Sequence, residues 1–175
     1  LPICDLSRDQ QVRNFAFVSL GYLGGDEARA NLITRLAKSG AGREKPWIAL
    51  ALGVMVAEAL NAGGQADPMI GDALASAFDK MKNPGWKGGI AVALGLARHK
   101  DAGLKIQDEM NTSRNPELRG YCAVGLGLMQ FREAQDDLRT LLDKSLRLPD
   151  LLKQVAIGLG LLGDKFVVNS LLKAL

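Results

Sequence analysis

One apolar phrase recurs five times along this chain, and it constrains the fold more than any other feature. Its clearest copy occupies residues 90–96, Ile-Ala-Val-Ala-Leu-Gly-Leu, and each of the other copies carries a leucine–glycine pair at the same place. We call the glycines of these pairs the anchor glycines: they are Gly21, Gly53, Gly95, Gly127 and Gly160. Self-similarity at a period of about 20–50 residues is typical of repeat proteins built from stacked units.

The residues around each anchor glycine predict a helix that is buried on most sides. A leucine precedes every anchor glycine, and the residue two before it is always small: Ser19, Ala51, Ala93, Gly125 or Gly158. Apolar and small residues at so many adjacent positions indicate that neighbours press on most of the helix surface. A glycine inside a helix costs about 1 kcal/mol relative to alanine, so five glycines in register predict a close backbone approach at that position.

A second, amphipathic helix is predicted after each phrase. Apolar residues recur seven, eleven and fifteen positions past the anchor glycine, as in Ala134, Leu138 and Leu142, and this spacing forms one stripe on a helix. The second repeat fits only if an insertion of about ten residues, 57–66, is placed in the turn between its two helices. The chain therefore reads as a series of helical hairpins.

Helix boundaries also recur. Prolines stand eleven residues before three anchor glycines, where a new first helix is predicted to begin: Pro84, Pro116 and Pro149. Aspartates stand near the predicted starts of the second helices, where a carboxylate can accept hydrogen bonds from free N–H groups: Asp26, Asp67, Asp101 and Asp164.

A hairpin of this kind cannot bury its own apolar faces and must stack on the next one. The pattern resembles HEAT repeats, most closely the short bacterial type named after phycobilisome lyases. The resemblance rests on Val12-Arg13 followed by Leu-Gly-Tyr-Leu-Gly-Gly-Asp at 20–26, and on Leu-Gly-Leu-Leu-Gly-Asp at 159–164. It covers about residues 9–175 and implies an all-α, right-handed α-solenoid (an α-α superhelix) of about five stacked helical hairpins.

We expect one HEAT-like repeat domain over residues 1–175 that is part of a longer chain. The predicted repeats occupy about 9–39, 40–82, 83–113, 114–146 and 147–175. The last predicted helix is more apolar than its predecessors, with Val167, Val168, Leu171, Leu172 and Leu175. Because a terminal repeat normally carries a polar face, we expect continuation of the chain or self-association through this C-terminal repeat.

Composition and motifs exclude several classes of function. The net charge of +3 is small and the charges are interleaved, so the balance does not require a nucleic-acid partner. No apolar run reaches the 18 or so residues of a membrane span. The two cysteines, Cys4 and Cys122, have no metal-site spacing, and His99 is the only histidine. We expect no cofactor, no metal and no catalytic residues.

A basic residue stands eight positions before four anchor glycines: Arg13, Lys45, Lys87 and Arg119. A ladder of cations with one member per repeat can grip a phosphate backbone. In HEAT-like repeats, however, the basic residue at this place pairs with acidic or carbonyl groups of adjacent repeats. We therefore interpret these four residues as a structural basic column.

Four conspicuous residues are interpreted as structural or solvated. Trp47 and Trp86 share columns with apolar residues of other repeats and are predicted to be core. Cys122 falls in a small, apolar column and is predicted to be a buried, inert thiol. His99 lies in the run Arg-His-Lys-Asp at 98–101, which predicts a solvated turn.

The second helices are expected to line the concave side of the stack, as the resemblance implies. Polar residues that project away from their apolar stripes would then form a mildly acidic concave face: Asp72, Ser76, Asp108, Asp136, Asp137 and Thr140. An acidic surface repels the phosphate backbone of a nucleic acid and attracts a basic or polar protein segment. The alternative is that these residues are only solvated helix faces.

These observations predict a non-catalytic scaffold that binds a protein or peptide on its concave surface. One alternative is an enzyme-associated or lyase-like HEAT domain, because similarity to phycobilin lyases would imply tetrapyrrole attachment to a partner. The other alternative is a nucleic-acid-binding HEAT-like module, since HEAT-like alkylpurine DNA glycosylases use a basic concave cleft. Loss of partner binding after alanine substitution of Asp72, Asp108 and Asp136 would assign binding to the acidic face.

Overall fold

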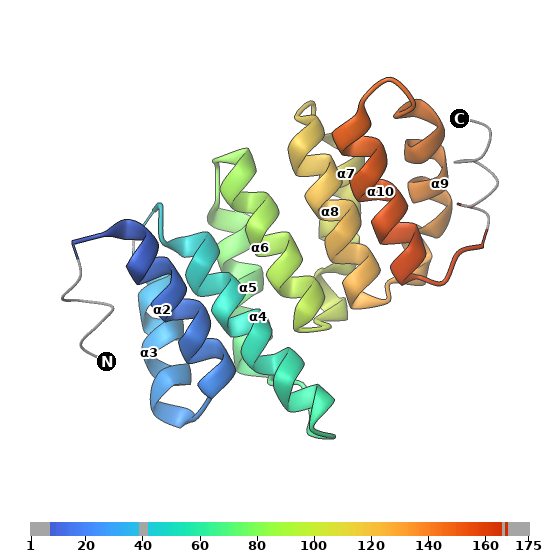
Figure 1. Cartoon of the computed structure of the whole chain (residues 1–175). Helices are drawn as coiled ribbons and strands as arrows, with labels where there is room; N and C mark the ends of the chain where they lie inside the picture. Colours follow the sequence, from blue (N-terminus) through green and yellow to red (C-terminus); the bar gives the residue numbers. More distant parts are fainter. Residues whose placement is uncertain (1–7, 39–41, 166, 168–175) are drawn as a thin grey trace.

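The computed structural model describes residues 8–38, 42–165 and 167, and every regular element within those residues is helical (Figure 1). The α-helices are α2 (Gln10–Leu23), α3 (Asp26–Ala37), α4 (Lys45–Asn61), α5 (Pro68–Lys80), α6 (Pro84–Leu96), α7 (Gly103–Thr112), α8 (Pro116–Met129), α9 (Gln135–Lys144) and α10 (Pro149–Leu161). Short 3₁₀ turns, Lys100–Ala102 and Arg132–Ala134, precede α7 and α9. The helices pack in sequence order, so the predicted all-α repeat fold is confirmed.

The even-numbered helices are the first helices of the hairpins, and the odd-numbered helices are the second helices. Three first helices begin at the prolines that the sequence placed there, Pro84, Pro116 and Pro149. Proline suits the first turn because the N–H group that it lacks would have no helical partner. Asparagine side chains precede two of these prolines and cap the helices: Asn83 accepts from Trp86 N at 3.1 Å and Asn115 from Leu118 N at 2.9 Å.

The predicted aspartate caps are confirmed at Asp67 and are wrong at Asp26 and Asp101. Asp67 caps α5, because its Oδ1 accepts hydrogen bonds from Met69 N at 2.9 Å and Ile70 N at 3.3 Å. Gly25 precedes α3 in the cap position, so Asp26 lies inside that helix, and Asp101 lies inside a 3₁₀ turn. Asp164 binds the guanidinium of Arg139, and the helix that it was predicted to cap lies outside the described residues.

The predicted insertion in the second repeat is only partly a loop. Helix α4 continues to Asn61, about two turns past its anchor glycine Gly53, so residues 57–61 are helical. Only residues 62–67 connect α4 to α5. The end of α4 consequently projects beyond the neighbouring first helices (Figure 1).

The core lies between the layer of first helices and the layer of second helices. In α6, Ile90 and Leu94 are completely buried and belong to one cluster with Leu74 of α5 and Ile106 of α7. The equivalent residues of α4, α8 and α10 are also buried: Ile48, Leu52, Cys122, Leu126, Val155 and Leu159. Those of α2, Ala16 and Leu20, are half-buried. The repeated phrase therefore supplies one wall of a core that runs through the described hairpins.

Four anchor glycines lie where consecutive first helices touch. A Cβ atom added to Gly53 would stand 2.8 Å from the Ala93 carbonyl oxygen, and one added to Gly127 would stand 2.5 Å from that of Gly158. Gly21 and Gly95 face backbone carbonyls of the next hairpin in the same way. We call these contacts the glycine joints. The close backbone approach predicted from the sequence is confirmed at these four positions.

Gly160, the fifth anchor glycine, differs from the other four. It is exposed, and an added Cβ would find no atom of the described residues within 4 Å. The reason is its position at the end of the stack, since no described hairpin follows α10. Most of the predicted apolar stripe after it, Val168, Leu171, Leu172 and Leu175, lies outside the described residues.

Candidate binding surface

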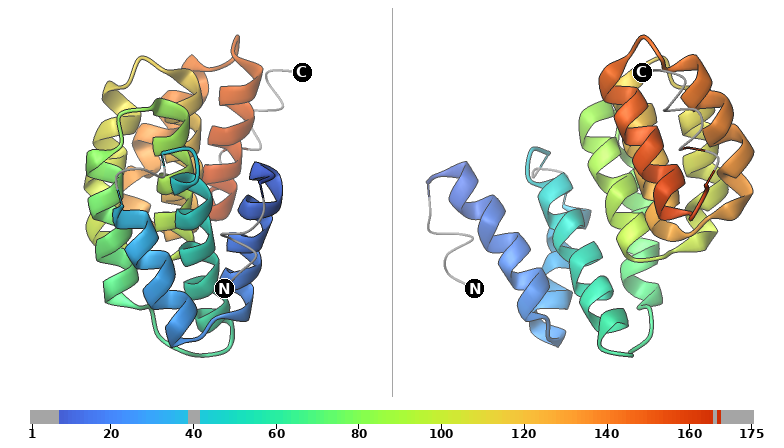
Figure 2. Two further views of the ribbon diagram at one scale, coloured as in Figure 1. Left: turned by 90° about the vertical axis from the view of Figure 1, so that its left-hand side faces the viewer. Right: turned by 45° about the vertical axis from the view of Figure 1, so that its right-hand side comes forward.

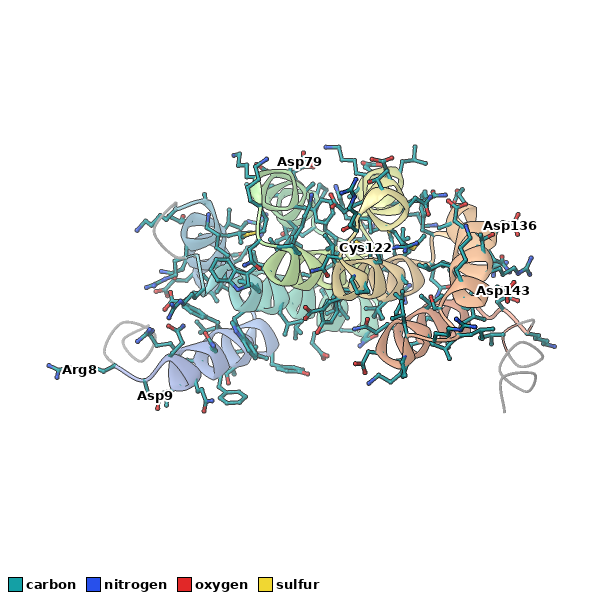
Figure 3. The ribbon with its side chains drawn as sticks, turned by 90° about the horizontal axis from the view of Figure 1, so that it is seen from above. Arg8, Asp9, Asp79, Cys122, Asp136 and Asp143 are labelled. Carbon is teal, nitrogen blue, oxygen red and sulfur yellow. The ribbon has the colours of Figure 1, made fainter. Side chains whose placement is uncertain are left out.

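The stack is curved, and its first helices form the inner side of the curve. Seen from above, α2, α4, α6, α8 and α10 follow the inner arc, while the second helices lie outside it and carry Asp79 and Asp136 (Figure 3). The glycine joints explain this curvature, because helices that meet at glycine can approach more closely than helices that meet through larger side chains. Consecutive first helices contact each other extensively, whereas consecutive second helices make few contacts.

The six residues predicted for a concave face lie on the outer layer instead. Asp72 and Ser76 belong to α5, Asp108 to α7, and the remaining three to α9. The prediction that the second helices line the concave side is therefore wrong for this chain. Within α9, Asp137 and Thr140 also differ in exposure, because Asp137 is half-buried in a polar contact while Thr140 is exposed.

Polar links to an aspartate connect the second helices at each joint of the described stack. The Arg29 guanidinium binds Asp67, and Lys105 Nζ lies 2.7 Å from Asp79. Asp137 accepts hydrogen bonds from Gln107 Nε2 at 2.7 Å and from Asn111 Nδ2 at 2.6 Å. Asp164 accepts one from Arg139 Nε at 2.7 Å. Asp136 also contacts Arg139, at 3.1 Å from Nη1. Asp67, Asp79, Asp137 and Asp164 thus serve contacts within the fold, whereas Asp72, Asp108 and Asp136 are exposed.

Two of these links hold the pKa of an aspartate below its ordinary value. The pKa of Asp67 is lowered chiefly by its hydrogen bond from Arg29, and burial opposes this effect in part. The pKa of Asp137 is lowered by the hydrogen bonds from Gln107 and Asn111. A carboxylate with a lowered folded-state pKa stabilises the fold above its unfolded pKa, about 3.9, and this stabilisation is lost as the pH falls through the folded value.

We therefore expect the free energy of unfolding to fall as the pH drops below about 4. Asp67→Asn removes the charge that binds Arg29, so its unfolding free energy should start lower at pH 7 and decline less on acidification. Urea denaturation at a series of pH values between neutral and acid measures this slope. Asp108→Asn, at an exposed position of α7, is the matched control and should follow the wild-type slope. An Asp67→Asn variant with the wild-type slope would contradict the assignment.

The basic column makes contacts within the fold. Arg13 Nε lies 2.8 Å from Glu44 of the next hairpin, and Arg119 Nε donates to the Met110 carbonyl oxygen of the previous hairpin at 2.9 Å. Lys87 pairs with Glu109, and its Nζ lies 4.7 Å from the centre of the Phe78 ring. Lys45 is half-buried at the start of α4.

An apolar column runs along the concave face through all five first helices. Two residues turn a helix by about 200°, so Val92 points away from both Ile90 and Leu94, which are buried against the second helices. Val92 therefore faces the inside of the curve. The equivalent residues of the other first helices are Val18, Leu50, Val124 and Ile157, and all five are half-buried or exposed. We call these five residues the concave column.

The middle of each first helix carries no charge on this face. Each first helix contains a stretch without Asp, Glu, Lys or Arg: residues 14–23, 46–57, 88–97, 120–131 and 154–163. A second apolar column follows each anchor glycine directly, with Tyr22, Val54, Leu96, Leu128 and Leu161, and all of these are half-buried or exposed as well. The central part of the concave surface thus offers apolar contact, and its charged residues, Glu117, Asp150 and Lys153, stand near the helix starts around the hollow described next.

A hollow of about 490 Å³ lies between the N-terminal halves of α8 and α10. Its lining combines Tyr121, Leu148 and Pro149 with the charged side chains of Glu117, Asp150 and Lys153. Tyr121 comes from the first helix α8 and Leu148 is 47% exposed, so the hollow is open to solvent and partly apolar. It is wide enough to accept a large apolar side chain from a ligand on the concave face.

Several sequence-based interpretations need correction. Trp47 is 37% exposed, and its ring lies 6.4 Å from that of Phe15 across the α2–α4 joint, so it is an inter-hairpin contact and not core. Trp86 is half-buried, with its ring against Gly42. The His99 side chain is only 14% exposed and packs on Gly71, so the solvated-turn prediction is wrong. Burial of Cys122 is confirmed, and burial raises the pKa of its thiol to about 12.

Neither a metal cluster nor a membrane span is present in the described part of the chain. No group of three His, Cys, Asp or Glu side chains there converges on a point that could hold a metal ion. No helix among these residues is both long and apolar enough to cross a bilayer. Comparisons with protein-family models, with curated proteins and with solved structures found no match to this chain.

Proposed function

We propose that this chain is a protein-interaction scaffold that binds the apolar face of a helical protein or peptide segment on its concave surface. The observation that carries the proposal is the concave column, an uninterrupted line of apolar side chains on the inner face of the curve. In this function the chain performs no catalysis, and its stacked hairpins form a HEAT-like scaffold.

Covering this surface is energetically favourable. Each square ångström of apolar surface removed from water contributes about 25 cal/mol, and every member of the concave column retains exposed apolar area. A ligand helix that presents apolar residues at i, i+3, i+4 and i+7 would place one line of side chains against the column. The hollow beside Tyr121 adds a place for one larger anchor residue.

The charge distribution favours a protein ligand over a nucleic acid. A phosphate backbone needs Lys or Arg side chains to neutralise it, and the five uncharged stretches of the first helices provide none. Arg13, Lys87 and Arg119 of the basic column contact acceptors inside the fold. Asp67, Asp79 and Asp137 of the outer layer are likewise engaged in links between hairpins, and the concave column offers the larger continuous apolar surface, so we place the proposed binding surface on the inner layer.

The proposal is tested with peptides selected from a displayed library of amphipathic helices. We expect the selected peptides to share apolar residues at helical spacing, and Val92→Asp to weaken their binding at least tenfold, about 1.4 kcal/mol. The reason is that a carboxylate at Val92 would be desolvated by any ligand that covers the centre of the concave column. Fluorescence anisotropy with a labelled peptide measures the affinity.

Matched controls lie on the outer layer. Asp72→Ala, Asp108→Ala and Asp136→Ala should leave the affinity of the same peptides unchanged, and circular dichroism should show that Val92→Asp remains folded. If the aspartate variants weaken binding and Val92→Asp does not, binding belongs to the outer layer. Selection of peptides without apolar periodicity would also reject the concave column as the binding surface.

A further inference from the structure

The connections between consecutive hairpins lie along one edge of the stack. Because the first helices all run in the same direction, each connection from a second helix falls at the N-terminal end of the next first helix. Three connections are described in full, residues 81–83, 113–115 and 145–148. They follow the upper edge of the molecule in both views of Figure 2. We call this edge the connection edge.

The connection edge is basic. The stretches 80–83, 113–115 and 144–148 contain no Asp or Glu, and they carry these exposed cations: Lys80, Lys82, Arg114, Lys144 and Arg147. None of these cations makes an ion pair within the part of the chain that the structure describes. The turns at the opposite edge are balanced instead, since Arg98, Lys100 and Arg132 stand there with Asp67, Asp101 and Glu133.

Acidic residues on the adjoining helix turns do not neutralise these cations in full. Asp79 lies 2.7 Å from Lys105 Nζ, so its charge is engaged on the outer layer. Asp150 lies 3.9 Å from Lys153 Nζ, and Glu117 and Asp143 are exposed. Lys80 and Lys144 also complement the negative ends of α5 and α9, but helix ends do not account for Lys82, Arg114 and Arg147 in the connections themselves.

The connection between α9 and α10 places a leucine at the tip of an ordered turn. Leu148 N donates a hydrogen bond to the Ser145 carbonyl oxygen at 2.8 Å, which closes a turn around Leu146 and Arg147. Ser145 is completely buried, and its Oγ donates to the Leu141 carbonyl oxygen at 2.5 Å. Leu146 is nevertheless 53% exposed. The turn therefore holds an apolar side chain in solvent beside a cation.

This connection also departs from the pattern of the other two. Asn83 and Asn115 precede the prolines of α6 and α8 and cap those helices with their side chains. Leu148 occupies the same place before α10, where no side chain caps the helix. A leucine cannot accept the hydrogen bonds of a capping residue, so the third connection is apolar where local stability favours a polar side chain.

We propose that the connection edge binds the surface of an anionic lipid bilayer, with its cations at the headgroups and Leu146 inserted beneath them. Each Lys or Arg near an anionic bilayer strengthens binding about fivefold, so five together contribute about 10³-fold. Insertion of the exposed leucine adds to this by removing apolar surface from water. The contact goes beyond the proposed concave ligand, because it uses a different surface of the molecule.

The leucine favours a bilayer over a nucleic acid. Both partners are anionic and would attract the same cations. A phosphate backbone, however, offers little apolar surface that could cover a leucine at the tip of a turn. The boundary between headgroups and acyl chains of a bilayer does accept such a side chain.

Sedimentation with vesicles tests the charge of the partner. We expect the 175-residue chain to co-sediment with phosphatidylcholine vesicles that contain phosphatidylserine, and to remain in solution with phosphatidylcholine alone. The combined variant Lys82→Gln, Arg114→Gln and Arg147→Gln should bind the anionic vesicles about 100-fold more weakly, because three cations are lost. Circular dichroism checks that this variant remains folded.

The opposite edge provides the matched control. Arg98→Gln, Lys100→Gln and Arg132→Gln together remove the same charge from exposed positions. This second variant should bind anionic vesicles with an affinity close to that of the wild type, because its substitutions lie away from the connection edge.

A fluorophore at the turn tests insertion. In a Cys4→Ser background Cys122 is the one remaining thiol, and it is completely buried, so a dye attached through Leu146→Cys reports on the turn. Its emission should shift to the blue when anionic vesicles are added. The same dye attached through Glu133→Cys, at an exposed position of the opposite edge, should show no shift.

Three outcomes would overturn the proposal. A wild-type chain that does not bind vesicles containing phosphatidylserine has no bilayer contact of this kind. Equal losses of affinity in the two triple variants would show an attraction by net charge, without a defined edge. Vesicle binding without a blue shift at position 146, together with displacement of the vesicles by duplex DNA, would assign the cations to a nucleic acid.

Discussion

Replacing Gly95 with alanine is expected to lower the free energy of unfolding by about 2 kcal/mol, although alanine is the better helix former. The added methyl group would collide with the Gly125 carbonyl oxygen and would lie 2.9 Å from Leu128 Cβ. Backbone atoms of two packed helices cannot move aside singly, so α6 and α8 must separate along their joint. The same change at Gly160 is expected to raise the free energy of unfolding by about 1 kcal/mol, because only the helix propensity changes there.

Urea denaturation of the two variants measures this contrast, at a protein concentration low enough that self-association does not contribute. The opposite signs of the two effects are the decisive result, since the substitution is chemically identical and both positions lie in the same repeated phrase. Equal stability changes at Gly95 and Gly160 would mean that the glycine joints do not govern the packing of first helices. If both variants have the m-value of the wild type, the stability differences arise in the folded state and not from a change in the unfolded chain.

The thiol of Cys122 is expected to react about 10³-fold more slowly with a disulfide reagent than a thiol in the unfolded chain. Its side chain is completely buried, and desolvation raises its pKa to about 12, so the reactive thiolate is scarce near neutral pH. Labelling then requires an opening of the α6–α8 region, and its rate reports the population of that open form.

The measurement uses Cys4→Ser, so that Cys122 is the one remaining thiol. Labelling with a chromogenic disulfide at pH 8 is compared in buffer and in concentrated urea. Combining Cys4→Ser with Gly95→Ala should speed labelling in buffer, because a weaker joint raises the open population, while the rate in urea stays the same. A rate in buffer close to that in urea would contradict the burial of this thiol.

Repetition in the sequence predicts the hairpins and their joints well. Five leucine–glycine pairs at one position of a helical phrase have a direct steric meaning, and four of them mark close backbone contacts. The prolines that begin α6, α8 and α10 likewise act through local geometry that the sequence contains in full. These features are predictable because each depends on residues of one hairpin and on an identical neighbour.

The direction of curvature was not predictable from periodicity. Periodicity tells which residues share a helix face, but curvature depends on the difference in spacing between two layers. Here the glycine joints bring the first helices together, so the acidic residues expected on the inside, such as Asp72 and Asp108, lie on the outside. The anchor glycines did indicate the direction of curvature. Helices that carry glycine at their contacts can pack closest to one another, and the layer with the closest-packed helices becomes the inner one.

Single side chains were misjudged where a contact depends on the shape of one joint. Trp47 shares a column with Phe15 and Tyr121, but the first joint lies near the end of the stack and leaves the indole partly in solvent. His99 is flanked by charged residues in sequence, yet the absence of a side chain at Gly71 opens the space that its ring fills.

The glycine joints also have a mechanical consequence. Backbone contact at the glycine joints fixes the closest distance between consecutive first helices, so the inner arc resists compression and each joint behaves as a pivot. Bending of the stack then changes the spacing of the second helices alone, where polar links such as Lys105 to Asp79 can lengthen through intervening water. Flattening brings the second helices together, and tighter curling stretches these links. The stiffness of the molecule against curling is therefore set by ion pairs and should soften in concentrated salt.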